Sequence, residues 1–342
     1  MLVLRLSGLY TVASSNSSPS QKKSSSQVVH PMNLRNYAVV LRRQVLCSIV
    51  IGTAFVCIAA VWSLGTLVAG EPIKALILDG QNNHGNWPET TEIMKHYLEE
   101  SGLFQVDIAR TAPKGIDETY SPKFADYKVV VSNYNGEAWP AQTQKNFVDY
   151  VQGGGGFVVV HAANNAFGDW PEYNRMIGLG GWGGRNEKSG PYVFLDSDGS
   201  VVRKTDAGPG GHHGSQHPFQ VVIRDGDHPI TSGLPKAWMH SQDELYDFLR
   251  GPGENMKILA TSFADPKHGG SGRHEPMVMV LEYGKGKVFH TPMGHGNISH
   301  ECVGYRTVFV RGCEWAATGQ VTTQVPSDFP GPDEPVVRSF KK

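Results

Sequence analysis

Short apolar runs alternate with amphipathic segments from residue 73 onward. Continuous apolar runs bounded by turn residues are typical of buried strands, and apolar positions three and four apart are typical of helices. We therefore expect strands at 73–79, 104–109, 127–132 and 157–161, and helices at 88–101 and 139–151. This order, with strands that are apolar on both faces, predicts a parallel sheet with helices on both sides.

The pattern changes after residue 161, where a Gly-rich, irregular segment extends to about residue 214. A hairpin is expected at 192–195 and 201–203, and further strands are expected at 219–224, 257–261, 277–282 and 287–291. A last helix is predicted from Cys302 to Ala317, and the four prolines after it indicate an extended tail over residues 321–342. Residues 71–320 therefore form one α/β domain with a mostly parallel central sheet, flavodoxin-like in class.

The first seventy residues are typical of a targeting region. Residues 1–31 are polar and Ser-rich, which predicts a disordered or untranslated leader, with Met32 as the alternative start. Three arginines then precede an uncharged run at 45–70 that is long enough to span a bilayer. Residues 32–70 are therefore either a signal peptide or an uncleaved membrane anchor. Both alternatives place residues 71–342 outside the cytoplasm, in the periplasm or the extracellular space, either free or tethered to the membrane.

Composition narrows the classes of function. The chain has 31 Lys and Arg against 32 Asp and Glu, a net charge of −1, which argues against nucleic acid as a partner. A hydrophobic content of 39% is enough for a sizeable core. Cys302 and Cys313 are the two cysteines of the domain, and no disulfide is expected because one helix would hold them about 16 Å apart.

Histidines and carboxylates carry the candidate chemistry. His161 ends a predicted strand, His295 follows a later strand, and His217 lies in a Gly-rich loop. The carboxyl ends of parallel strands open onto a common crevice, so His161 and His295 are expected to converge there. Asp243 and Glu244 are adjacent, and therefore only one of the two carboxylates is expected to reach the crevice.

Amides and aromatic rings in the same connections suit a polar, uncharged ligand such as a sugar. The candidate substrate-binding residues are Asn82, His84, Asn135, Asn164, Trp170 and Tyr246. For each of these residue types, a purely structural role remains the alternative to substrate binding or catalysis. The amides would then stabilise tight turns, the histidines would be ordinary core or surface residues, and the carboxylates would pair with Arg250.

Motifs spread along the domain resemble the ThuA-like, or trehalose-utilisation, family. They include DGQNNH at 79–84, VVVSNYNG at 129–136, HGSQH at 213–217, DELY at 243–246 and YGKGKVFHTPMGH at 283–295. The resemblance covers about residues 71–330 and implies a class I glutamine-amidotransferase-like fold. His161 and Ala162 stand in the region where amidotransferases carry their nucleophilic cysteine, so glutamine hydrolysis by that route is not expected.

The resemblance also implies the use of trehalose or related disaccharides through 3-keto sugars. It implies a divalent metal, Zn or similar, in some relatives, for which the ligands here would come from His161, His217, Glu244 and His295; no cofactor is otherwise indicated. We therefore expect an exported enzyme that cleaves or converts (3-keto-)glycosides or disaccharides, with His161, Glu244 and His295 in acid–base roles. A non-catalytic sugar-binding module and a metal-dependent hydrolase of a non-sugar substrate are the alternatives. A small sugar is the expected partner, and a homo-oligomer is left open.

Overall fold

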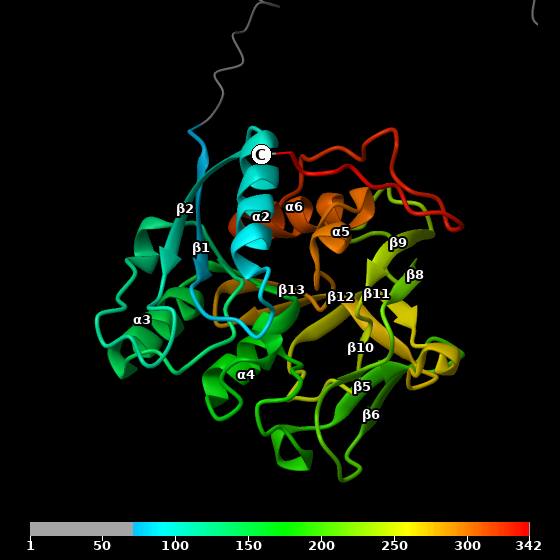
Figure 1. Ribbon diagram of the computed structural model, residues 1–342, viewed down its shortest axis with the longest axis horizontal. Coiled ribbons are helices and arrows are strands. Elements are labelled where there is room, and N and C mark those ends of the chain that lie inside the picture. The colour runs from blue at the N-terminus through cyan, green and yellow to red at the C-terminus, as the bar shows by residue number, and fades with distance from the viewer. Residues whose placement is uncertain (1–70, 342) are drawn as a thin grey trace, which may run out of the picture. The chain divides into compact units, whose positions relative to one another are not determined.

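The computed structural model describes residues 71–341 (Figure 1). The predicted leader at 1–31 and the predicted signal or anchor segment at 32–70 lie outside the described residues. Among the helices of residues 71–341, none combines the length and the apolar character that a membrane crossing requires.

The parallel half of the sheet has the strand order β2-β1-β3-β4-β13. These strands are β1 (Ile73–Asp79), β2 (Phe104–Arg110), β3 (Val129–Ser132), β4 (Gly156–Val160) and β13 (Gly286–Thr291). β3 and β4 are buried throughout, and β1 is buried over its last five residues. Burial on both faces explains why these strands are continuous apolar runs in the sequence.

Beyond β13 the sheet continues through antiparallel strands in the order β12-β11-β8-β9, and the hairpin of β5 and β6 pairs with β12. The strands are β5 (Tyr192–Leu195), β6 (Val201–Lys204), β8 (His217–Ile223), β9 (Ala237–Asp243), β11 (Met256–Phe263) and β12 (His274–Tyr283). A separate ribbon pairs β7 (His212–His213) with β10 (Tyr246–Asp247). The predicted hairpin and strands are confirmed, whereas β7, β9 and β10 are too polar to be predicted from apolar runs.

Helices cover both faces of the sheet (Figure 1). One face carries α2 (Trp87–Glu100), α5 (Asn297–His300) and α6 (Val303–Thr318), and the other carries α3 (Ala141–Gln152) and α4 (Pro171–Ile177). Short 3₁₀ helices are η1 (Phe124–Asp126), η2 (His161–Asn165), η3 (Glu187–Ser189) and η4 (Pro266–His268). The predicted α/β class, with a central sheet between two helical layers, is thus confirmed; β2, β1, β3, β4 and β13 form the parallel part of that sheet, and its other strands are antiparallel.

α6 is buried along most of its length, and two glycines allow this close approach. A Cβ at Gly304 would lie 2.4 Å from the indole nitrogen of Trp238, and a Cβ at Gly312 would lie 2.4 Å from the ring of Phe289. The helix ends at Gly319, whose φ of +78° favours glycine. Within the described chain both buried cysteines are free, as predicted.

Residues 320–341 contain no helix but pack along α6. The buried carboxylate of Glu314 accepts hydrogen bonds from both the backbone N–H and the hydroxyl of Thr322 and of Thr323. Phe329 packs on Trp238 with ring centroids 5.6 Å apart. The C-terminal segment is therefore extended, as predicted, and it is also docked on the domain.

Candidate metal centre and adjoining cleft

Three histidines and one glutamate meet beyond the carboxyl ends of the strands. His84 follows β1, His161 follows β4, Glu244 follows β9 and His295 follows β13. One nitrogen or oxygen from each residue lies within 4.8 Å of the others. Glu244 Oε2 is 2.9 Å from His295 Nδ1, 3.7 Å from His161 Nε2 and 3.9 Å from His84 Nε2. We call these four residues the histidine cluster.

His161 owes its place in the histidine cluster to a sharp turn. β4 ends at Val160, one residue earlier than predicted, and His161 opens η2 with a φ of +47°. A side chain in this left-handed region costs about 1–3 kcal/mol, which the surrounding packing has to offset. The turn brings the His161 ring to 4.9 Å from the His84 ring and 5.5 Å from the His295 ring, measured between centroids.

Hydrogen bonds on the outer nitrogens fix two of the imidazoles. His161 Nδ1 is 2.7 Å from the carbonyl oxygen of Pro292, which can only accept, so Nδ1 carries the proton. His84 Nδ1 likewise donates to Asn82 Oδ1 at 3.1 Å. Each Nε2 therefore carries no proton and can accept a hydrogen bond or bind a metal ion. Outer hydrogen bonds of this kind orient histidines that bind metals.

Burial also sets the protonation of the histidine cluster. It lowers the pKa of His161 to about 3, and burial together with nearby His295 lowers the pKa of His84. Burial alone would raise the pKa of Glu244, but His295 and His161 outweigh it, and the pKa falls. At neutral pH His84 and His161 are therefore neutral imidazoles, the protonation state that binds metal ions, whereas the hydrogen bond to Glu244 raises the pKa of His295.

The donor set of the histidine cluster fits a divalent transition metal, because imidazole and carboxylate groups suit Zn²⁺ and similar ions. Two ligands with bonds of about 2.0–2.2 Å to one ion lie roughly 3–4 Å apart. The three distances from Glu244 Oε2, between 2.9 and 3.9 Å, agree with that range. Nδ1 of His295 is also buried. It meets no hydrogen-bond geometry within the described chain, although Oε2 of Glu244 lies 2.9 Å away. His84, His161, Glu244 and His295 would hold the ion.

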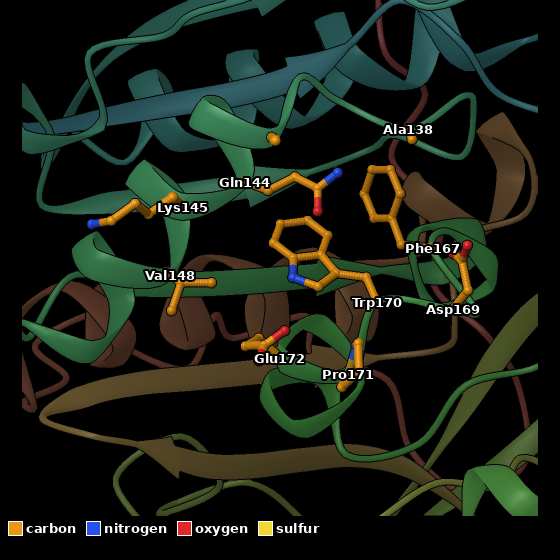
Figure 2. A pocket seen from close by; sticks show the side chains of 10 residues that line it. Ala138, Gln144, Lys145, Val148, Phe167, Asp169, Trp170, Pro171 and Glu172 are labelled. Atoms are coloured by element: carbon orange, nitrogen blue, oxygen red, sulfur yellow. The ribbon is translucent and has the colours of Figure 1, made fainter.

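Two residues predicted for the site lie elsewhere. His217 begins β8 and stacks on His268, with ring centroids 3.8 Å apart, so His84 takes the fourth place in the histidine cluster. Trp170 was expected to contact substrate, but it lines a different surface hollow of about 530 Å³ (Figure 2). That hollow lies between α3 and the start of α4, and Trp170 stacks there on Tyr173.

A polar cleft of about 480 Å³ adjoins the histidine cluster. It is lined by Asn83, His84, Asn135, Asn165, Trp182, Gly183, His213, Glu244 and Tyr246. His84, Asn135 and Tyr246 were predicted as substrate-binding residues, and the structure places all three in this lining. The Tyr246 hydroxyl also lies 2.9 Å from His161 Nε2. Neither Lys nor Arg is among these lining residues.

Two other predicted amides support the site from behind. Asn82 orients His84 and donates to the carbonyl of Asn133 at 3.1 Å. Asn164 is fully buried, with its Nδ2 3.1 Å from His290 Nε2. The neighbours of these two, Asn83 and Asn165, line the cleft instead. The position of an asparagine after a strand predicts that it lies near the cleft. It does not determine which of two adjacent asparagines has its side chain in the cleft.

Trp182 and His213 reach the cleft from the irregular segment after η2. Trp182 has a φ of +47°, and its N–H donates to the carbonyl of Gly210 at 2.7 Å. The buried guanidinium of Arg185 donates to the carbonyls of Asn165 and Gly181, which fixes this segment. No hydrophobic period marks such a loop, so an aromatic ring and a histidine in a polar connection are the signals that the sequence offers for these positions.

The adjacent carboxylates do not pair with Arg250. Its guanidinium is buried and donates to the carbonyls of Gly190, Asp206 and Gly208. Glu244 joins the histidine cluster, whereas Asp243 is buried behind it. One of the two carboxylates therefore faces the crevice, as the sequence predicted.

The fold and site define an α/β protein with a histidine–carboxylate centre at the carboxyl edge of its parallel strands. The chain matches the ThuA family, described as trehalose utilisation, over residues 74–316 and belongs to that family. A crystal structure described as a ThuA-like protein from Parabacteroides merdae is 48% identical, with a TM-score of 0.76, and covers 78% of this chain and 98% of its own.

A second ThuA-like structure, from Bacteroides uniformis, is 19% identical with a TM-score of 0.53, covers 74% of this chain and 95% of its own, and shares the fold. No protein of curated function matches the chain. The family predicted from the sequence motifs is thereby confirmed.

Proposed function

We propose that this chain is an exported carbohydrate-active enzyme that cleaves or converts (3-keto-)glycosides or disaccharides by acid–base chemistry, with a divalent metal at the histidine cluster. One observation carries the proposal: His84 and Glu244 belong both to the histidine cluster and to the lining of the polar cleft. A ligand in the cleft would therefore touch ionisable groups directly. The trehalose-utilisation description of the family supports a sugar as that ligand.

The lining of the cleft suits an uncharged, hydroxyl-rich molecule. The amides of Asn83, Asn135 and Asn165 offer both donors and acceptors to sugar hydroxyls. Trp182 offers an apolar face, and its ring lies 4.7 Å from that of Tyr246. A phosphorylated sugar would meet no cationic Lys or Arg among these residues, so a neutral substrate fits better.

The chemistry follows from the keto group of the substrate, which acidifies the neighbouring C–H. A base takes this proton, and the C–H electron pair forms an enolate. When the enolate collapses, the glycosidic C–O bond breaks and the departing oxygen takes up a proton. A group bound to the ion cannot take the proton, so Glu244 or His161 is the base when it is not coordinated, and His295 stabilises the developing charge. A divalent ion, when bound, supplies Lewis-acid stabilisation of a carbonyl oxygen.

Residues 32–70 are proposed as the export segment, either cleaved or retained as an anchor. The domain would then act in the periplasm or the extracellular space, where disaccharides enter from outside. The uncharged run at 45–70, preceded by arginines, supports this location.

Turnover of 3-keto and intact disaccharides by the full chain tests the function, with products separated by chromatography. We expect Glu244→Gln and His161→Ala each to lower kcat/KM by at least about 100-fold, since a general base contributes about 10²–10⁴. His217→Ala, outside the histidine cluster, is the matched control and should retain activity. Full turnover by both variants on every 3-keto glycoside that the wild type cleaves would refute the mechanism.

Two other results would favour the alternative functions. Sugar binding without any product after long incubation would indicate a binding module. Activity that a chelator abolishes and that shows no preference for sugars would indicate a hydrolase of other substrates.

A further inference from the structure

Asp243 joins the two loops that carry Glu244 and His295. The carboxylate is 1% exposed, and each oxygen accepts two hydrogen bonds. Oδ1 accepts from the backbone N–H of Glu244 at 2.8 Å and of His295 at 2.9 Å. Oδ2 accepts from the backbone N–H of Gly294 at 2.8 Å and from His240 Nε2 at 2.8 Å. One side chain thus holds the backbone beneath two members of the histidine cluster.

The sheet alone does not fix the spacing of these two members. Glu244 follows β9 and His295 follows β13, and three strands (β12, β11 and β8) separate β9 from β13 in the strand order. Even so, Glu244 Oε2 and His295 Nδ1 lie 2.9 Å apart. Besides Asp243, the hydroxyl of Ser241 on β9 donates to the carbonyl of Ile298 at 2.7 Å. These side-chain bonds, rather than strand pairing, bring the two loops together.

We propose that Asp243 is a positioning residue that sets the separation of Glu244 and His295, so that metal affinity depends on its carboxylate. The inference rests on the proposed metal centre. An asparagine at 243 would offer one acceptor oxygen, and its NH₂ group would face an N–H on the other side. At least one loop contact would therefore be lost. Changes outside the ligands that disturb ligand orientation typically lower metal affinity about 10- to 100-fold.

The chain offers a matched control for a purely structural role. Glu314 is likewise a buried carboxylate that accepts four hydrogen bonds, in its case from Thr322 and Thr323. Its partners lie in the C-terminal segment and contribute nothing to the histidine cluster. Glu314→Gln should therefore destabilise the fold without changing metal affinity.

The test is the Zn²⁺ affinity of the full chain, measured by competition with a chelating indicator well below each variant's unfolding temperature. Binding at the histidine cluster is the component that His295→Ala removes. We expect Asp243→Asn to weaken this component about 10- to 100-fold and Glu314→Gln to leave it unchanged. His240→Leu removes one donor to Asp243 and should weaken it by a smaller factor.

Wild-type affinity in Asp243→Asn would overturn this inference while leaving the metal centre in place. Absence of Zn²⁺ binding by the wild type would overturn both the inference and the proposed centre. If Asp243→Asn does not fold, His240→Leu decides, and unchanged affinity in that variant counts against the inference.

Discussion

Buried arginines hold the irregular connections together at the level of single residues. Arg185 and Arg250 are both buried, and the carbonyl oxygens of turns accept most of their hydrogen bonds. Burial lowers the pKa of Arg185 to about 10, yet the side chain stays charged at neutral pH. A buried charge is tolerated only when hydrogen bonds satisfy it, so each arginine constrains several turns at once. The Gly-rich segment beside the cleft is therefore ordered by polar contacts.

Glu275 on β12 should make folding stability depend on pH. Burial raises its pKa to about 8, against a usual value of 4.5. Between about pH 4.5 and 8 the unfolded chain releases this proton while the folded chain keeps it, so the free energy of unfolding falls as pH rises. Glu275→Gln cannot ionise and should raise the melting temperature by several degrees at the upper end of this range. Thermal unfolding across the pH range measures the effect.

Glu282→Gln is the control for this prediction, because Glu282 is exposed on the same strand. Its melting temperatures should follow those of the wild type at every pH. Parallel curves for Glu275→Gln and the wild type would show that Glu275 does not keep its proton in the folded chain.

Hydrophobic patterning predicts the elements that build the sheet better than those that shape the site. β3 and β4 are apolar and buried, and α6 is a long apolar helix, so all three could be predicted from the sequence. The sequence of β9 is AWMHSQD. Its His240, Ser241 and Asp243 are buried and make hydrogen bonds in place of apolar contacts, so the strand does not stand out as an apolar run. α4 has seven residues, too few for a helical period.

The candidate site shows the same division. His161 and His295 were predicted to converge because they follow parallel strands, a consequence of topology. His84 joins the histidine cluster, and Trp182 and Asn165 line the cleft. These placements depend on turns with unusual backbone angles, or on which of two adjacent residues faces the site. Those details arise from tertiary contacts that a single sequence does not display.

Gly312 is expected to be essential for the seating of α6 on the sheet. A Cβ there would lie 2.4 Å from the ring of Phe289 on β13. Alanine usually favours a helix over glycine by about 1 kcal/mol, but overpacking costs about 1–3 kcal/mol. We expect Gly312→Ala to lower the melting temperature by several degrees in thermal unfolding. Gly226→Ala, where no atom lies within 4 Å of the added Cβ, is the control. A variant as stable as wild type would mean that Phe289 moves aside without cost.

The histidine cluster links loops from the whole length of the domain, since its members follow β1, β4, β9 and β13. An ion bound there would connect the parallel and antiparallel parts of the sheet. It would bind the folded chain and not the unfolded one, so binding free energy would add to folding stability.

Zn²⁺ at about 100 times its Kd should therefore add about 2.7 kcal/mol to the free energy of unfolding. A thermal-shift assay with and without a chelator measures this effect. His84→Ala should remove the shift, and His217→Ala should preserve it. Identical melting temperatures of the wild-type chain with and without Zn²⁺ would contradict the prediction.

The position of β13 also dictates the order in which the protein can fold. β13 lies between β4 and β12 in the sheet, yet residues 286–291 form it, after all other described strands have been synthesised. Until this stretch arrives, the inner edges of β4 and β12 have no partner. Pairing across such a long sequence separation is slow, and unpaired strand edges promote aggregation. Fragments that end before residue 286 should therefore aggregate, and the nascent chain should complete its sheet only near the end of synthesis.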